Sequence, residues 1–430
     1  TSNSDLVYEL ENGFKEMKKI GGIDDYELEY LPILDRILPT LTEFPANPYT
    51  PTAVDDPRVF KGRDVEIRRV TEALNDGHKA IVIYGISRVG KTSLLRFLSK
   101  RFLPRINFLP VLVNLQGLSE HNEEGFWFEM ARKISQKLDD VGLLQKGHKV
   151  IGKDRNKIVT FENICAWIEK VTEGLYSDRL VILLDEINVL EDMWENRNMA
   201  VRVTAQLKAL VESKLKIHFI FSVQEVFYKY FAITNNSYLL NTLLRLAIPI
   251  QLDHLDRAAA ESLIRDPMGK VIKYQTELVN NLIDVTASHP FYLQTLLLNL
   301  ISKSRDDDCY ELSSSELDTV LAEVILGGGS LFAQFLNEDS VFHRDVLSVL
   351  ASDEKHLGKW YSIQEVSQVL SNRGYRIYER GLIESLEKQR SWGALEQRIG
   401  SDGKLLYAIR VPLYQLWLHK KFPVELIKPK

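Results

Sequence analysis

The chain has 430 residues, 45% of them hydrophobic, which is enough for about two to four globular domains with sizeable cores. Its formal net charge of -5 excludes a general attraction to nucleic acid or anionic membranes, but not a local basic patch. Cys165 and Cys309 are the only cysteines, which excludes a disulfide framework and favours a reduced, cytoplasmic protein. Since no apolar stretch of about 18 residues and no signal-peptide pattern is present, we expect no membrane contact.

The first part of the chain predicts an extension followed by an α/β core. Residues 1–46 carry one helical pattern around Leu6–Met17, and the turn-rich segment Asn47–Pro51 marks a boundary. Apolar runs typical of buried strands then lie at Lys79–Tyr84, Phe108–Leu115, Arg179–Leu184, Lys216–Phe221 and Leu246–Leu252. Helical patterns separate them at Thr92–Phe102, Glu123–Leu138 and Met199–Ser213. This alternation predicts a parallel sheet covered by helices on both faces over residues 47–253.

After Asp253 the pattern becomes helical, and no further strand is expected before the last hundred residues. Helices predicted over residues 254–337, a helical lid subdomain, are Asp256–Ile264, Gln275–Thr286, Pro290–Ser302 and Ser314–Leu326. Residues 338–430 predict three short helices at His343–Ala351, Ser362–Leu370 and Tyr378–Gln389, then a hairpin of Leu395–Ile399 and Leu405–Val411. Three helices and a hairpin in this order are typical of a winged helix-turn-helix.

The segment after the first predicted strand fits the phosphate-binding pattern GxxxxGK[ST] in full. It reads Gly85-Ile86-Ser87-Arg88-Val89-Gly90-Lys91-Thr92, and Ser93 continues the helix that follows. The two glycines allow a tight curl in which backbone N–H groups face a phosphate, and the helix N-terminus adds its positive dipole end. Lys91 would contact the β- and γ-phosphates, and the Thr92 hydroxyl would bind Mg²⁺. The pattern therefore predicts a P-loop ATPase that binds ATP or ADP with Mg²⁺.

An acidic pair closes the third predicted strand. Asp185 and Glu186 follow Leu183-Leu184, at the strand end that faces the ligand crevice in a parallel sheet. We expect Asp185 to hold Mg²⁺ through water and Glu186 to act as the general base on the attacking water.

Two further positions are weaker candidates. In P-loop ATPases with a glutamate base, the strand Lys216–Phe221 would lie between the other two, so Ser222 or Gln224 at its end could sense the γ-phosphate. Arg245 could reach a phosphate of its own chain or of a neighbouring subunit, although polar strand ends and lone arginines more often have no such role.

These motifs and three others together resemble the STAND ATPases, the signal-transduction ATPases with numerous domains. Val59-Phe60-Lys61-Gly62-Arg63-Asp64-Val65-Glu66 is similar to their hhGRExE motif, and Asn47-Pro48-Tyr49 to a segment that often precedes it. The resemblance implies that Phe60, Gly62 and Arg63 lie beside the adenine; a salt-bridged arginine in a helix-start turn is the simpler interpretation. Ser288-His289-Pro290 resembles the GxP motif, which implies that Pro290 approaches the nucleotide, although Ser288 replaces the glycine. Arg410–Trp417 resembles the segment that closes the winged helix of the family.

The resemblance leaves two functions open. The first is a regulatory switch, latched by ADP and opened by ATP, that acts in signalling or defence by forming a homo-oligomer with an unknown effector or sensor protein. The second is an initiator, loader or transposition-regulator ATPase that binds duplex DNA through the winged helix. Origin-recognition relatives place an arginine in the lid, and only Arg257 and Arg265 are available there. Residues 338–430 hold 15 Lys and Arg against 12 Asp and Glu, a surplus of three, which is weak for DNA binding and favours the switch.

Overall fold

The computed structural model describes residues 45–117, 122–143, 160–175, 179–192, 197–228, 240–332, 341–353 and 356–427. The helical pattern expected around Leu6–Met17 therefore lies outside the described residues. Within the described ranges, no helix combines the length and the apolar character that crossing a membrane requires.

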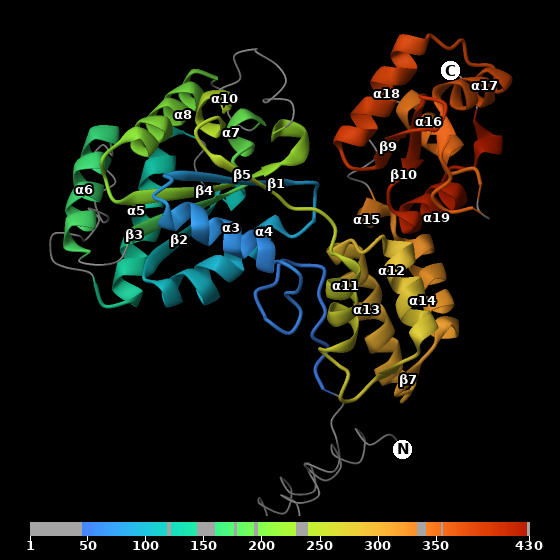
Figure 1. Ribbon diagram of the computed structural model, residues 1–430, viewed down its shortest axis with the longest axis horizontal. Coiled ribbons are helices and arrows are strands. Elements are labelled where there is room, and N and C mark those ends of the chain that lie inside the picture. The colour runs from blue at the N-terminus through green and yellow to red at the C-terminus, as the bar shows by residue number, and fades with distance from the viewer. Residues whose placement is uncertain are drawn as a thin grey trace, which may run out of the picture.

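A five-stranded sheet with the order β2-β3-β4-β1-β5 forms the centre of the α/β part (Figure 1). Its strands are β1 (Ala80–Gly85), β2 (Phe108–Asn114), β3 (Arg179–Asp185), β4 (Ile217–Gln224) and β5 (Ile248–Gln251). All neighbouring strands pair in parallel, so the carboxyl ends of all five lie along one edge. Strand β4 lies between β3 and β1, as the sequence predicts for an ATPase with a glutamate base.

Helices cover both faces of this sheet, which confirms the predicted architecture. On one face, Ile81 and Ile83 of β1 pack in a core with helices α3 (Asp64–Asn75) and α4 (Lys91–Phe97). On the other, Ala80 and Val82 share a core with helices α5 (Glu123–Asp140), α6 (Phe161–Gly174) and α8 (Arg197–Glu212). Successive side chains of a strand point to opposite faces, and both sets are apolar because both faces are buried.

Four helices follow the sheet within a few residues of their predicted limits: α11 (Arg257–Arg265), α12 (Thr276–Thr286), α13 (Pro290–Asp306) and α14 (Ser314–Gly327). The prediction that strands stop after Asp253 was wrong in detail. Strands β6 (Lys273–Tyr274) and β7 (Glu311–Leu312) form a short parallel pair between these helices. Strands of two residues are too short to show an alternating pattern, so the sequence gives no signal for them.

The C-terminal elements have the order expected of a winged helix. Helices α16 (Val341–Leu350), α17 (Ile363–Asn372) and α18 (Glu379–Ser391) precede the hairpin of β9 (Leu395–Ile399) and β10 (Leu405–Ile409). A short strand β8 (Tyr361–Ser362) completes a three-stranded sheet with the order β8-β10-β9, and helix α19 (Pro412–Lys421) ends the segment.

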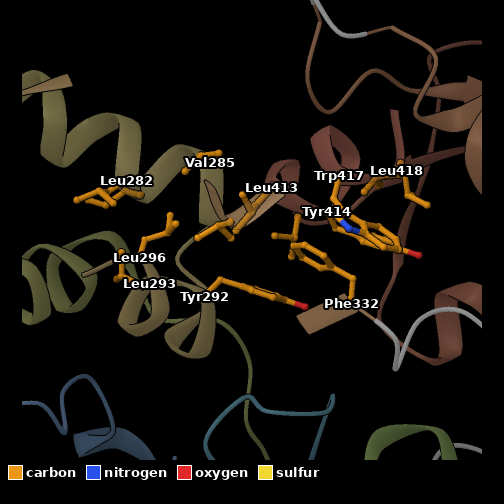
Figure 2. Packing of buried hydrophobic residues seen from close by; sticks show 14 of the residues in the cluster. Leu282, Val285, Tyr292, Leu293, Leu296, Phe332, Leu413, Tyr414, Trp417 and Leu418 are labelled. Atoms are coloured by element: carbon orange, nitrogen blue, oxygen red, sulfur yellow. The ribbon is translucent and has the colours of Figure 1, made fainter. Parts of the chain in front are cut away.

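The two predicted C-terminal units, 254–337 and 338–430, pack around one hydrophobic core. Among the described residues, one cluster of buried side chains has members from Leu255 to Ile427 and also includes Tyr49 and Val59. An aromatic group joins the two halves (Figure 2). Phe332 packs with ring centroids 5.5 Å from Tyr292 of α13, and 5.5 and 5.1 Å from Tyr414 and Trp417 of α19. Helix α19 is therefore part of the core that supports the helical lid.

Candidate nucleotide site

The loop between β1 and α4 is shaped by its two glycines. A Cβ atom on Gly85 would lie 2.4 Å from the carbonyl oxygen of Leu252, so no side chain fits there. Gly90 precedes α4 with a φ of 106°, in the left-handed region that favours glycine. Arg88 also has a positive φ, of 60°. The backbone thus curls tightly just before the N-terminus of α4, as phosphate binding requires.

Lys91 lies inside this loop. Its side chain is buried, and its Nζ donates hydrogen bonds to the carbonyl oxygens of Gly85 and Ile86 at 3.1 and 3.0 Å. Burial lowers the pKa of Lys91, and the negative charges of Glu186 and Asp185 oppose this shift. The ammonium is therefore close enough to the acidic pair for all three to belong to one site.

The acidic pair lies at the carboxyl end of β3, next to the loop. Asp185 is 2% exposed, and Glu186 has a φ of 58°, an uncommon backbone conformation for a residue other than glycine. Its carboxylate oxygen Oε2 is buried without a hydrogen-bond partner. Burial raises the pKa of Glu186, and the charge of Asp185 adds to this effect while Lys91 opposes it. A half-buried carboxylate with a raised pKa, one of whose oxygens lacks a hydrogen-bond partner, has the properties of a general base.

The two weaker candidates have different positions. Ser222 is fully buried at the end of β4, between the two acidic residues: its Oγ donates to Asp185 Oδ1 at 2.5 Å. Gln224 follows it on the strand, and its side chain lies beside the carboxylate of Glu186. Arg245 is exposed and precedes β5, at the amino edge of a parallel sheet whose phosphate loop is at the carboxyl edge. The structure therefore does not bring Arg245 to the site of its own chain.

The upstream motif packs against both the phosphate loop and the helical lid. The Arg63 guanidinium is buried and donates to the carbonyl oxygens of Val89 and Asp253, each at 2.9 Å. Arg63 also pairs with Glu66 at 3.5 Å, as the simpler interpretation expects. Gly62 has a φ of 67°, and a Cβ atom there would lie 2.3 Å from Cβ of Ala259 in α11.

Side chains next to Arg63 and Lys91 also join the upstream motif to helix α4. The ring of Phe60 stacks on Phe97 of α4 with centroids 4.3 Å apart. The Ser93 hydroxyl accepts a hydrogen bond from the backbone N–H of Val54 at 3.1 Å, which fixes the segment before the motif to α4.

The Ser-His-Pro segment lies against the phosphate loop through His289 and the adjacent Phe291. Ser288 adopts a positive φ of 57°, so the backbone that glycine would favour forms without it. Pro290 begins α13, and the adjacent Phe291 ring lies 4.3 Å below the guanidinium of Arg88. His289 is fully buried beside the backbone of Ser87, and burial lowers its pKa well below the usual value.

The sequence reasoning missed a cluster around His289. The His254 ring packs edge-on against it with centroids 4.9 Å apart, and His254 Nδ1 bonds to the carbonyl oxygen of Ala287 at 2.7 Å. Arg410, directly after β10, forms an ion pair with Asp253. Gly393, in the turn between α18 and β9, lies so close to the loop that a Cβ atom would be 2.6 Å from Cγ2 of Ile86. Since these residues are far apart in sequence, only the fold reveals that they meet at the phosphate loop.

The residues present fit a nucleotide and Mg²⁺. Gly90 has no side chain that would cover the loop backbone, where phosphate oxygens bind in P-loops, and Lys91 supplies a cation. Thr92 in the first turn of α4 and Asp185 at the end of β3 offer a hydroxyl and a carboxylate, the hard oxygen ligands that Mg²⁺ prefers. Among the described residues no group of three or more His, Cys, Asp or Glu forms a metal cluster. Two protein ligands completed by phosphate oxygens and water are usual for Mg²⁺.

The sheet order, the phosphate loop and the acidic pair define a P-loop NTPase. Residues 49–314 match the family nSTAND1, Novel STAND NTPase 1, and the chain therefore belongs to this family of STAND NTPases. A search of curated proteins gave no match.

Solved structures of P-loop ATPases have a similar fold. The Walker-type ATPase paby2304 of Pyrococcus abyssi is 18% identical with a TM-score of 0.65, over 87% of this chain and 99% of that one. The Aeropyrum pernix ORC2 protein, solved in ADPNP-ADP complexes, is 14% identical with a TM-score of 0.55, over 85% and 97% of the two chains. At such identities the likeness shows the fold alone.

Proposed function

We propose that the chain hydrolyses ATP, with Glu186 as the general base. Its half-buried carboxylate takes a proton from water while the water oxygen bonds to the γ-phosphorus. The bond from that phosphorus to the β–γ bridging oxygen breaks, which releases ADP and phosphate. Lys91 holds the β- and γ-phosphates and offsets the charge on the leaving ADP. Support comes from the position of Glu186 beside Lys91 and from its unpartnered oxygen Oε2.

Thr92 and Asp185 would hold Mg²⁺, which when bound neutralises phosphate charge and polarises the γ-phosphoryl group. Asp185 lies in a hydrogen-bonded position at the end of β3, so it needs little rearrangement to do so.

We further propose that hydrolysis operates a regulatory switch, in which ADP favours the closed arrangement and ATP the open one. The observation that carries this proposal is the contact of the phosphate loop with elements distant in sequence. Arg88 lies over Phe291 and its Nη1 reaches the carbonyl oxygen of Leu331 at 3.4 Å, while Gly393 packs on Ile86. Because a nucleotide would bind at the same loop, its phosphates can favour one arrangement of these contacts over another.

The consequence of opening would be assembly. Rotation of the C-terminal part away from the loop would expose the surfaces around Phe291 and Gly393, which could then contact a second copy or an effector protein. The alternative of duplex DNA binding has less support, because the arginines of α18 pair with carboxylates. Arg380 bonds to Glu384 at 3.1 Å and Arg390 to Glu387 at 2.7 Å, and carboxylates repel phosphate.

The decisive experiment is sizing by light scattering with ADP and with a slowly hydrolysed ATP analogue, in parallel with fluorescence anisotropy on duplex DNA. A larger species with the analogue and none with ADP supports the switch. Tight DNA binding with a steep salt dependence, and no change of size, would establish the DNA-bound ATPase in its place.

A further inference from the structure

One hydroxyl group connects the ends of the two central strands. Ser222, fully buried, donates through Oγ to Asp185 Oδ1 at 2.5 Å and accepts from the backbone N–H of Glu186 at 2.8 Å. The N–H of Ile187 donates to the Ser222 carbonyl oxygen at 3.0 Å. Three hydrogen bonds therefore fix the turn after β3 to the end of β4.

The turn begins where β3 separates from β4, although β2 still pairs with β3 up to Asp185. Regular pairing of β3 with β4 ends at Leu184 and Phe221, one residue before Asp185. Glu186 then adopts a φ of 58°, which is strained for an L-residue and persists only where its surroundings hold it. The Ser222 hydroxyl is the acceptor that satisfies the N–H of Glu186, so it helps to maintain this conformation.

The same hydroxyl has no proton left for a phosphate. A serine side chain has a single O–H donor, and that of Ser222 is used on Asp185. The oxygens of an ionised γ-phosphate can only accept hydrogen bonds, so contact with Ser222 would require the bond to Asp185 to break. Gln224, by contrast, is only partly buried and lies beside Glu186.

We propose that Ser222 is a positioning residue, which orients Asp185 for Mg²⁺ and Glu186 for the attacking water, and is not a sensor of the γ-phosphate. This role rests on the proposed ATP hydrolysis. Residues that support metal ligands or catalytic groups through hydrogen bonds typically change affinity or activity by about 10- to 100-fold when replaced. Ser222→Ala removes both side-chain bonds and should act through Asp185 and Glu186 alone.

The test compares wild type, Ser222→Ala and Ser222→Thr in steady-state ATP hydrolysis and in Mg²⁺ titrations of ATP binding. For Ser222→Ala we expect kcat to fall and the Mg²⁺ requirement to rise, each by about 10- to 100-fold, with binding of Mg²⁺-free ADP within about twofold of wild type. Ser222→Thr keeps the hydroxyl and should restore most of the loss. Ser304→Ala is the matched control, because it removes another buried hydroxyl that bonds to the Cys309 carbonyl oxygen in the helical part.

Ser222→Ala with wild-type kcat and Mg²⁺ requirement would overturn the proposal. The proposal would also be overturned if Ser222→Ala keeps the wild-type kcat and Mg²⁺ requirement but binds ATP no more tightly than ADP. That result is expected when a sensor of the γ-phosphate is lost. If Ser222→Ala does not fold, the near-isosteric Ser222→Cys, with a much weaker donor, takes its place with the same expected direction. If wild type binds Mg²⁺ and ATP without hydrolysis, the proposed activity fails, but the Mg²⁺ titration still decides the role of Ser222.

Discussion

The contact between Gly393 and Ile86 allows the switch to be tested with a single methyl group. In Gly393→Ala the new Cβ would lie 2.6 Å from Cγ2 of Ile86 in the closed arrangement. Overpacking of this kind costs about 1–3 kcal/mol, and the open arrangement does not incur it. A bias of that size changes a two-state equilibrium about 5- to 150-fold. We therefore expect Gly393→Ala to release a fluorescent ADP analogue faster than wild type, by a factor in that range, in a stopped-flow chase with unlabelled ADP.

Gly403→Ala is the control, because it separates the contact from backbone strain. Both glycines have a positive φ, 84° at Gly393 and 77° at Gly403, so alanine costs each about 1–2 kcal/mol. A Cβ atom on Gly403, however, meets no atom within 4 Å. Adding Ile86→Ala to Gly393→Ala removes Cγ2 and should slow release again. Equal release rates for the Gly393 and Gly403 variants, with equal losses of thermal stability, would refute the reasoning.

Three further predictions concern the site and its surroundings. Lys91→Ala should abolish ATP binding in calorimetry while leaving the circular dichroism spectrum unchanged; unchanged affinity would exclude the phosphate loop as the site. Glu186→Gln should bind ATP with Mg²⁺ but hydrolyse it about 10²- to 10⁴-fold more slowly, and because the pKa of Glu186 is raised, the wild-type rate should fall on acidification at a higher pH than an ordinary glutamate would give. Burial, and the positive charge of Arg410, lower the pKa of His254 from 6.5 to about 4. On acidification the unfolded chain therefore takes up the proton before the folded chain does. The free energy of unfolding should fall as the pH drops from 6.5 towards 4, by at most about 1.4 kcal/mol per pH unit. His254→Asn should reduce that slope in urea titrations, and a slope equal to that of wild type would contradict the assignment.

The sequence predicted the elements whose pattern is long and local. The five strands of the sheet were recognisable because each is a continuous apolar run, and the phosphate loop because its glycines and Lys91 have a fixed spacing. The prediction that β4 lies between β1 and β3 came from the strand order of P-loop ATPases with a glutamate base, and the structure confirms it.

What the sequence did not predict depends on contacts between distant residues. Ser222 looked like any polar strand end, and only the register of β3 and β4 shows its hydroxyl between Asp185 and Glu186. Arg410 and Asp253 carry no local signal for each other, since they lie in different parts of the chain. Helix α6 was not predicted, because no motif adjoins it and its amphipathic pattern alone did not distinguish it.

The aromatic group of Tyr292, Phe332, Tyr414 and Trp417 couples movement of the last helix to movement of the helical lid. Because these rings join the helical lid to the last helix in one core, the two parts resist bending relative to each other. A displacement of helix α19 would therefore pass through Phe332 to Tyr292 of α13, the helix that begins at Pro290 beside the phosphate loop.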